Sequence, residues 1–180
     1  MNNLNRYHIN GIQFYDWQYK HHLPLAGTPS NPKSVWKDIM NRDTYLSTIE
    51  KYIELAHKHG MTAMFYNLAF GALSDAYYDG VSELWYIYTD KNHTNRDKHD
   101  LPVPPFKSSI YLVDPSNTGW QDFIGVKNDD VYSVFDFDGF HIDQLGDRGK
   151  ALYTYSGTPV NLSGTYPSFV QAMKNKAQNK

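Results

Sequence analysis

The stretch DFDGFHIDQLGDRG, residues 136–149, decides the fold. Residues 139–143 alternate large apolar side chains with polar ones, which is the two-residue period of a β-strand. The apolar residues point to one face of the strand, and His141 and Asp143 point to the other. Two glycines follow within six residues of Asp143. We therefore expect the strand to end on the carboxylate of Asp143.

Apolar periodicity on either side of this strand predicts further strands and helices. Asp43 is the expected N-cap of the first helix, and Gly60 is its expected C′ residue. Residues 68–107 form a long connection that is rich in aromatic residues and then in proline. The expected strands are 11–17, 61–67 and 109–114, and the expected helices are 44–59, 119–135 and one that begins near Thr165 and Pro167.

The alternation of strands and helices predicts a parallel sheet with crossover helices. We interpret this α/β order as the (β/α)8 TIM-barrel type, with about four of its eight βα units present. A complete barrel typically takes ~250 residues, whereas this chain has 180, so the prediction is a partial barrel in a single domain. An open, doubly wound sheet is the alternative.

Composition excludes several classes of function. The net charge is −2 and the basic residues are scattered, so neither nucleic acid nor a membrane surface is an expected partner. No apolar run approaches the ~20 residues of a membrane span, and the N-terminus lacks the apolar segment of a signal peptide. Cysteine is absent, which excludes disulfides and thiolate sites. The 15 tyrosines and 4 tryptophans suit either stacking on sugars or filling of the core.

Polar side chains stand at the expected strand ends. Asp16, Asp114 and Asp143 each end a strand, and Tyr66-Asn67 ends another. In a (β/α)8 barrel the carboxyl ends of the strands carry the active site. These residues are therefore candidates for contacts with a substrate. Trp17, beside Asp16, is a candidate for stacking on a sugar ring, with core filling as the alternative.

Two stretches carry a resemblance to a known family. NGIQFYDWQYKHHLPL (residues 10–25) and DGFHIDQLGDRG (residues 138–149) resemble family 66 of the glycoside hydrolases. This family comprises bacterial dextranases and cycloisomaltooligosaccharide glucanotransferases. The resemblance implies that residues 1–180 are the N-terminal half of a (β/α)8 catalytic domain. It also implies an extracellular or cell-surface bacterial parent protein.

The resemblance further implies a reaction and a nucleophile. Family members act on α-1,6-linked glucans such as dextran with net retention, and they need no cofactor. Their nucleophile is an Asp at the end of the fourth strand, which corresponds to Asp143 here. Their general acid/base is a Glu on a later strand, which is expected beyond Lys180. The substrate-binding candidates are Asp16, Trp17, Tyr66, Asn67, Asp114 and His141.

The residues leave alternatives open. Retaining glycosidases need two carboxyl groups ~5–5.5 Å apart, and none of the three glutamates, Glu50, Glu54 and Glu83, falls at an expected strand end. A non-catalytic carbohydrate-binding α/β module is the second hypothesis, and an unrelated small-molecule-binding protein is the third. No histidine or carboxylate spacing predicts a metal site. We expect the isolated chain to be inactive and to self-associate through its unpaired strand edges.

Overall fold

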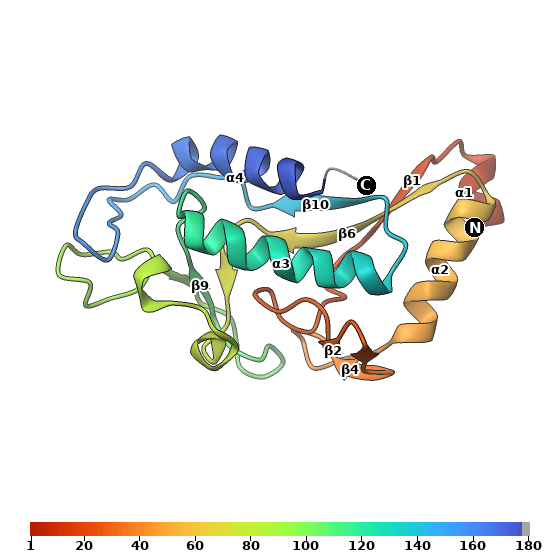
Figure 1. Cartoon of the computed structure of the whole chain (residues 1–180), viewed down its shortest axis with the longest axis horizontal. Coiled ribbons are helices and arrows are strands. Elements are labelled where there is room, and N and C mark those ends of the chain that lie inside the picture. The colour runs from red at the N-terminus through yellow and green to blue at the C-terminus, as the bar shows by residue number, and fades with distance from the viewer. Residues whose placement is uncertain (178–180) are drawn as a thin grey trace.

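The computed structural model describes residues 1–177 of the chain, and its centre is a parallel sheet (Figure 1). The sheet has three strands in the order β1-β6-β10. In chain order the elements are α1 (Asn2–Arg6), β1 (Gly11–Phe14), β2 (Gly27–Thr28), β3 (Asn31–Pro32), β4 (Val35–Lys37), β5 (Asp43–Tyr45), α2 (Leu46–Lys58), β6 (Thr62–Leu68), β7 (Gly71–Ala72), the 3-10 helices η1 (Ala76–Asp79) and η2 (Glu83–Trp85), β8 (Lys98–His99), β9 (Ile110–Leu112), α3 (Thr118–Val134), β10 (Gly139–Asp143) and α4 (Leu162–Lys176).

Local sequence signals set the helix ends. At the end of α2, Gly60 has a φ of +69°, its N–H donates to His57 O, and the N–H of Met61 donates to Ala56 O. This pair of bonds closes the helix as a Schellman motif, so the predicted role of Gly60 is confirmed. At the start of α3, the Asn117 side chain accepts from two backbone N–H groups and caps the helix.

Two helices begin at different residues from those predicted. The predicted helix 44–59 begins at Leu46, because Asp43–Tyr45 pairs with Val35–Lys37 as an antiparallel strand. Asp43 is therefore in a strand and does not cap the helix. The last helix begins at Leu162, where the Asn161 side chain accepts from Gly164 N. Thr165 and Pro167, where the prediction begins the helix, thus lie inside it, and the helix starts about one turn earlier.

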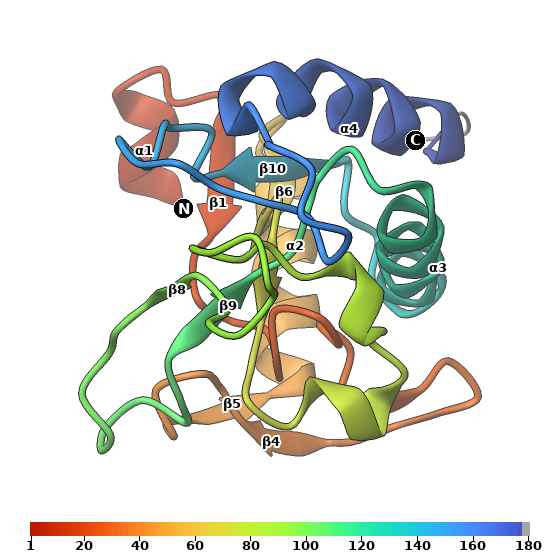
Figure 2. The ribbon, with the colours of Figure 1, turned by 90° about the vertical axis from the view of Figure 1, so that its left-hand side faces the viewer.

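The expected third parallel strand is the main correction to the fold. Residues Ile110–Leu112 form β9, which pairs antiparallel with β7 and β8 in a second three-stranded sheet. The reason is that residues 68–107, predicted as a connection, contain these two partner strands. Figure 2 shows β8 and β9 away from the parallel strands, while α3 runs beside β6 and β10. The described residues thus form an α/β fold whose parallel sheet has three strands, and Asp143 ends the third.

The core consists of two large apolar clusters. One lies between the parallel sheet and α2, and Trp17 is part of it with an exposed fraction of 3%. Its ring packs edge-on against Trp36, Phe65 and Phe135. The other cluster lies between the antiparallel sheet, α3 and α4, with Trp120 fully buried in it. Within residues 1–177, we find no helix with the length and apolar character needed to cross a membrane.

Candidate active site at the strand ends

The carboxyl ends of β1, β6 and β10 bring predicted site residues together. The register pairs His141 with Tyr66 and Asp143 with Leu68, so both polar residues of β10 lie beside the end of β6. The ring of Tyr66 lies 5.8 Å from that of His141 and 4.2 Å from that of Tyr15, measured between centroids. Tyr66 therefore lies between the end of β1 and the end of β10.

The charged groups of this site perturb one another. Burial raises the pKa of Asp16 from 3.8 to about 6; Arg42 opposes the rise, and Asp38 and Asp143 add to it. Burial also raises the pKa of the Tyr66 hydroxyl, and hydrogen bonding to Tyr15 and to Asp143 raises it further. At neutral pH Tyr66 is thus a protonated phenol that can donate to the Asp143 carboxylate. Perturbed carboxyl groups of this kind are typical of active sites.

A cavity of about 310 Å³ opens beside these residues. It lies between the strand ends and the segment that carries β8, so polar groups of the parallel sheet face groups of the antiparallel sheet. The lining residues are Tyr15, Asp16, His21, Ile39, Tyr66, Leu68, His99, Asp100, Leu101, Phe106, Ile110 and Gln144. A cavity with a largely apolar wall and a few polar groups is typical of a small-ligand site.

His21 and Asn67 form a buried pair at this cavity. Asn67 donates from Nδ2 to His21 O over 2.7 Å and accepts at Oδ1 from Leu68 N over 2.8 Å, which fixes the orientation of its amide. The Nδ1 of His21 lies 2.9 Å from Asn67 Oδ1 and 2.9 Å from Gln18 Nε2. Burial lowers the pKa of His21 to about 4, so the ring is neutral at pH 7. The Nε2 of His21 is buried and has no hydrogen-bond partner within residues 1–177.

Of the predicted site residues, Asp16 and Tyr66 line the cavity, whereas His141 and Asp143 lie on β10, which ends just before the lining residue Gln144. Three other predicted substrate-binding residues lie elsewhere. Trp17 is in the core, which makes core filling the explanation of its position. Asn67 is fully buried and supports His21 rather than presenting its amide to the cavity. Asp114 follows the antiparallel strand β9, and its Oδ1 accepts from the backbone N–H and the hydroxyl of Ser116, so it stabilises the turn before α3.

His21 and His99 are cavity residues that the sequence analysis did not identify. His21 lies in the stretch that carries the family resemblance, but no spacing or periodicity marks it as a site residue. His99 lies in β8, a strand of two residues that is too short to leave a periodic signal. Its contribution depends on the pairing of β8 with β9, which no local pattern reveals.

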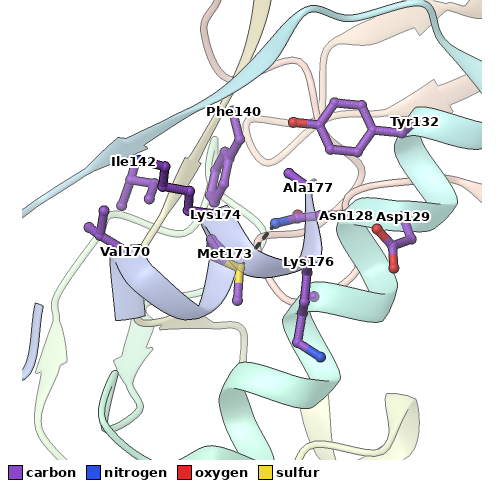
Figure 3. Close-up of a pocket in the computed structure, with 11 residues that line it drawn as sticks. Asn128, Asp129, Tyr132, Phe140, Ile142, Val170, Met173, Lys174, Lys176 and Ala177 are labelled. Atoms are coloured by element: carbon purple, nitrogen blue, oxygen red, sulfur yellow. Dashed lines mark hydrogen bonds between the residues drawn. The ribbon is translucent and has the colours of Figure 1, made fainter. Parts of the chain in front are cut away.

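His141 shares a strand face with Asp143, as the two-residue period predicts. The residue is half-buried, and its Nδ1 is buried without a hydrogen-bond partner among the described residues. The opposite face of β10 presents Phe140 and Ile142 to an apolar cavity of about 190 Å³ between α3 and α4 (Figure 3). The two faces of the strand therefore have different roles, one polar at the site and one apolar against the helices.

The remaining acidic groups are engaged in other contacts. Glu83 forms an ion pair with Arg96 and accepts from the Tyr88 hydroxyl, so it does not act at the strand ends. His22, Asp75 and Asp79 lie close enough to share a metal ion. The Lys20 ammonium already lies between the two carboxylates, at 2.7 Å from Asp75 and 2.6 Å from Asp79. This lysine supplies the positive charge that a cation would bring.

Comparison with known proteins identifies the family. The model of glycosyl hydrolase family 66 matches residues 1–180. Two cycloisomaltooligosaccharide glucanotransferases from Niallia circulans are 33% and 35% identical over 94% of this chain, which covers 17% of each of them. A dextranase from Streptococcus salivarius is 23% identical over 93% of this chain and 21% of its own length. The chain belongs to glycosyl hydrolase family 66, and it spans about a fifth of the length of these relatives.

A solved structure agrees with this assignment. The cycloisomaltooligosaccharide glucanotransferase of Paenibacillus sp., complexed with cycloisomaltoheptaose, superposes with a TM-score of 0.87 at 34% identity, over 97% of this chain and 25% of that one. A maltogenic α-amylase from Thermotoga neapolitana matches with a TM-score of 0.58 at 19% identity, over 99% of this chain and 37% of that one. The second likeness concerns the fold alone.

Proposed function

We propose that this chain supplies the nucleophile, Asp143, of a retaining glycoside hydrolase or transglycosylase that acts on α-1,6-glucans such as dextran and isomaltooligosaccharides. The observation that carries the proposal is the meeting of Asp143, Tyr66 and Asp16 at three parallel strand ends beside an open cavity, in a chain of family 66. In this proposal residues 1–180 are part of a larger (β/α)8 catalytic domain. Because dextran is a polymer too large to enter a cell, the parent protein acts outside the cell or on its surface.

The chemistry requires two carboxyl groups with different roles. One oxygen of Asp143 attacks the anomeric carbon as the glycosidic C–O bond breaks, and the leaving oxygen takes a proton from a general acid. Water or a sugar hydroxyl then displaces the carboxylate, giving net retention. The three glutamates of this chain lie away from the strand ends. We therefore propose that the acid/base glutamate comes from a part of the protein beyond Lys180.

The neighbours of Asp143 suit this reaction. The Tyr66 hydroxyl, whose pKa is raised in part by Asp143, can donate to the nucleophile and orient it and, unlike a lysine, does not neutralise it. His141, two residues earlier on the same face, is within reach of the same sugar, where it can bind the 2-hydroxyl. Asp16, with a pKa raised to about 6, is a strong acceptor for sugar hydroxyls in its ionised form.

A second candidate is a glucan-binding module without catalysis. The observation that favours it is that no glutamate lies at the strand ends within residues 1–177, where the second carboxyl group, Asp16, is assigned to binding sugar hydroxyls. Both candidates place a glucan in the cavity of about 310 Å³. They differ in whether Asp143 forms a bond to the sugar.

The test replaces Asp143 in the full-length protein. Asp143→Ala should lower kcat on dextran by at least ~10⁴-fold, because the covalent step is lost. Added azide should restore turnover, since this small anion fits the vacated space and attacks the same face of the sugar, yielding a β-glucosyl azide. Asp114→Asn, a strand-end carboxylate outside the cavity, is the matched control and should retain activity. A variant Asp143→Ala that keeps a hundredth of wild-type turnover would contradict the assignment.

A further inference from the structure

The backbone immediately after Asp143 is held in an unfavourable conformation. Gln144 has a φ of +65°, in the left-handed region that residues other than glycine rarely adopt. Such a conformation persists where the surrounding structure fixes the chain on both sides. On the N-terminal side, the pairing of β10 with β6 fixes Asp143. An anchor is therefore needed on the C-terminal side, within the few residues that follow.

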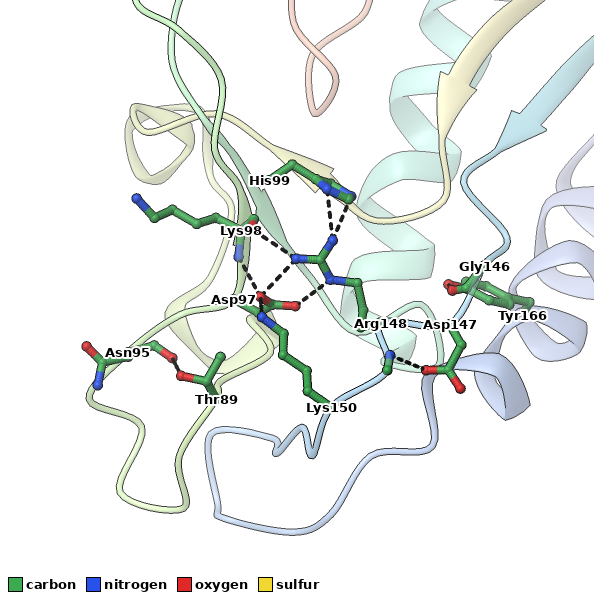
Figure 4. A network of polar contacts seen from close by, with 11 residues as sticks. Thr89, Asn95, Asp97, Lys98, His99, Gly146, Asp147, Arg148, Lys150 and Tyr166 are labelled. Atoms are coloured by element: carbon green, nitrogen blue, oxygen red, sulfur yellow. Dashed lines mark hydrogen bonds and ion pairs between the residues drawn. The ribbon is translucent and has the colours of Figure 1, made fainter.

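Arg148 provides that anchor by binding a buried carboxylate on the other sheet (Figure 4). Its Nε donates to Asp97 Oδ2 over 2.8 Å, and its Nη2 donates to Asp97 Oδ1 over 3.1 Å. Lys150 adds a bond of 2.6 Å to Oδ1, and Arg148 Nη2 also donates to Lys98 O over 2.9 Å. Two parallel bonds from one guanidinium to one carboxylate fix orientation as well as distance.

Asp97 is itself rigidly placed. Its exposed fraction is 2%. Its backbone N–H donates to Ile87 O, its carbonyl accepts from Leu112 N, and its Oδ1 accepts from Lys98 N over 2.9 Å. Burial alone would raise the pKa of Asp97, but hydrogen bonds from Arg148 and Lys150 outweigh it and lower the pKa. Asp97 is thus an ionised group on a fixed piece of backbone.

The same arginine also orients a histidine of the cavity wall. Arg148 Nη1 lies 2.8 Å from Nδ1 and 3.3 Å from Nε2 of His99, and a guanidinium can only donate. The nearer nitrogen, Nδ1, is therefore the acceptor, which leaves the proton of the neutral ring on Nε2. Burial first, and then the charge of Arg148, lower the pKa of His99 and keep the ring neutral. His99 lines the cavity beside Asp16 and Tyr66.

We propose that Asp97 and Arg148 are positioning residues. They hold residues 144–150, the segment after the nucleophile, against the antiparallel sheet, and so fix the orientation of Asp143 and the tautomer of His99. This inference rests on the proposed function of Asp143. The Tyr166 hydroxyl, which donates to Gly146 O over 2.6 Å, supports the middle of the segment from α4. The side-chain bonds of Arg148 go to Asp97, His99 and the carbonyl of Lys98, not to Asp143, so the pair acts on the nucleophile through other groups.

The experiment uses Asp97→Asn, Arg148→Gln and Arg148→Lys in the full-length protein. Arg148→Gln leaves Lys150 to compensate the Asp97 charge, which keeps this variant foldable, and Arg148→Lys keeps the charge but lacks the paired donors. Lys150→Met is the matched control, because it removes a cation from Asp97 and leaves both Arg148 bonds in place. The measurements are kcat and KM on dextran, affinity for a non-hydrolysable isomaltooligosaccharide analogue, and amide hydrogen exchange.

A misplacement of about 1 Å can cost ~10²-fold in rate. We therefore expect Asp97→Asn and Arg148→Gln to lower kcat by ~10²-fold, with KM and analogue affinity changed less than about threefold. Hydrogen exchange should accelerate in residues 144–150 and stay unchanged in α3. Arg148→Lys should fall between these variants and the wild type, and Lys150→Met should resemble the wild type.

Three results would overturn the inference, and they are distinguishable. Faster exchange in residues 144–150 with an unchanged kcat would mean that the contact between Arg148 and Asp97 does not orient Asp143. A uniform acceleration of exchange, with activity proportional to the folded fraction, would mark the pair as purely structural. A wild-type protein without glycosyl transfer would refute the proposed function, and the positioning role with it. Hydrogen exchange in residues 144–150 would still show whether the contact between Arg148 and Asp97 orders this segment.

Discussion

Asp16 lies at the proposed substrate site, and replacing it by Asn should raise the free energy of unfolding of the protein at neutral pH. The Asp16 carboxyl is half-buried at the end of β1, and burial is the largest cause of its raised pKa, with Asp143 and Asp38 contributing in the same direction. Ionising this group in the folded protein is therefore unfavourable. An amide of the same shape removes the charge and keeps a similar volume.

The magnitude follows from the pKa. A rise of the Asp16 pKa from 3.8 to about 6 means that folding disfavours the ionised carboxyl relative to the protonated one by about 3 kcal/mol. Water reaches a half-buried carboxylate and screens much of this energy, so about 1 kcal/mol is a realistic contribution. The folded state binds the proton of Asp16 more tightly than the unfolded state does, so the protonated carboxyl adds to the free energy of unfolding. This addition is fully present below pH 3.8 and is lost as the pH rises through about 6.

The assay is urea unfolding of the wild type and of Asp16→Asn at a series of pH values from 4 to 7. The free energy of unfolding of the wild type should fall by about 1 kcal/mol relative to the variant across this range. Glu50→Gln, an exposed carboxylate on α2, is the control and should follow the wild type. The reasoning is refuted if the difference between Asp16→Asn and the wild type is independent of pH, or if it grows in favour of the wild type as the pH rises.

Three further outcomes are expected. His141→Ala in the full-length protein should lower kcat more than it weakens binding of a non-reacting glucan, since a hydrogen bond gained in the transition state acts on kcat; equal losses would mark a binding or packing role. Trp17→Ala should destabilise the protein by about 3–5 kcal/mol in urea unfolding, whereas Tyr78→Ala, at an 88% exposed residue, should have little effect. The isolated chain should self-associate in light scattering at several concentrations, because β1 and β10 are edge strands among the described residues; a monomer at all concentrations would contradict this.

Local patterns in the sequence were sufficient to predict most of the strands of the parallel sheet. The alternation in residues 139–143 placed β10 and the shared face of His141 and Asp143, and apolar runs placed β1 and β6 within a few residues. Gly60 marked a helix end correctly, because its capping chemistry depends on the neighbouring residues alone. The resemblance to family 66 was confirmed by the match over residues 1–180.

Non-local pairing was what the sequence could not reveal. Residues 109–114 have the periodicity of a strand, and periodicity does not say which strand is the partner. Their partners, Gly71–Ala72 and Lys98–His99, contain two residues each and lie in a segment that resembles a loop. The expected third parallel strand, residues 109–114, was therefore wrong, and with it the prediction that Asp114 lies at the parallel strand ends beside Asp143. The same limitation hid His99 and Asp97.

The strand ends show why the site itself resists prediction from local preference. Asp16, with a φ of +48°, and Gln144, with a φ of +65°, both adopt the left-handed conformation at the ends of β1 and β10. Gln does not favour that conformation, and Asp, although enriched there relative to most residues, adopts it in a minority of cases, so local sequence does not predict it. Distant contacts fix the backbone nearby: Arg42 Nη2 donates to Asp16 O over 3.3 Å, and Arg148 anchors the segment after Gln144 on Asp97. Stability from the rest of the fold thus maintains strained backbone where the proposed chemistry requires carboxylates to project from the sheet.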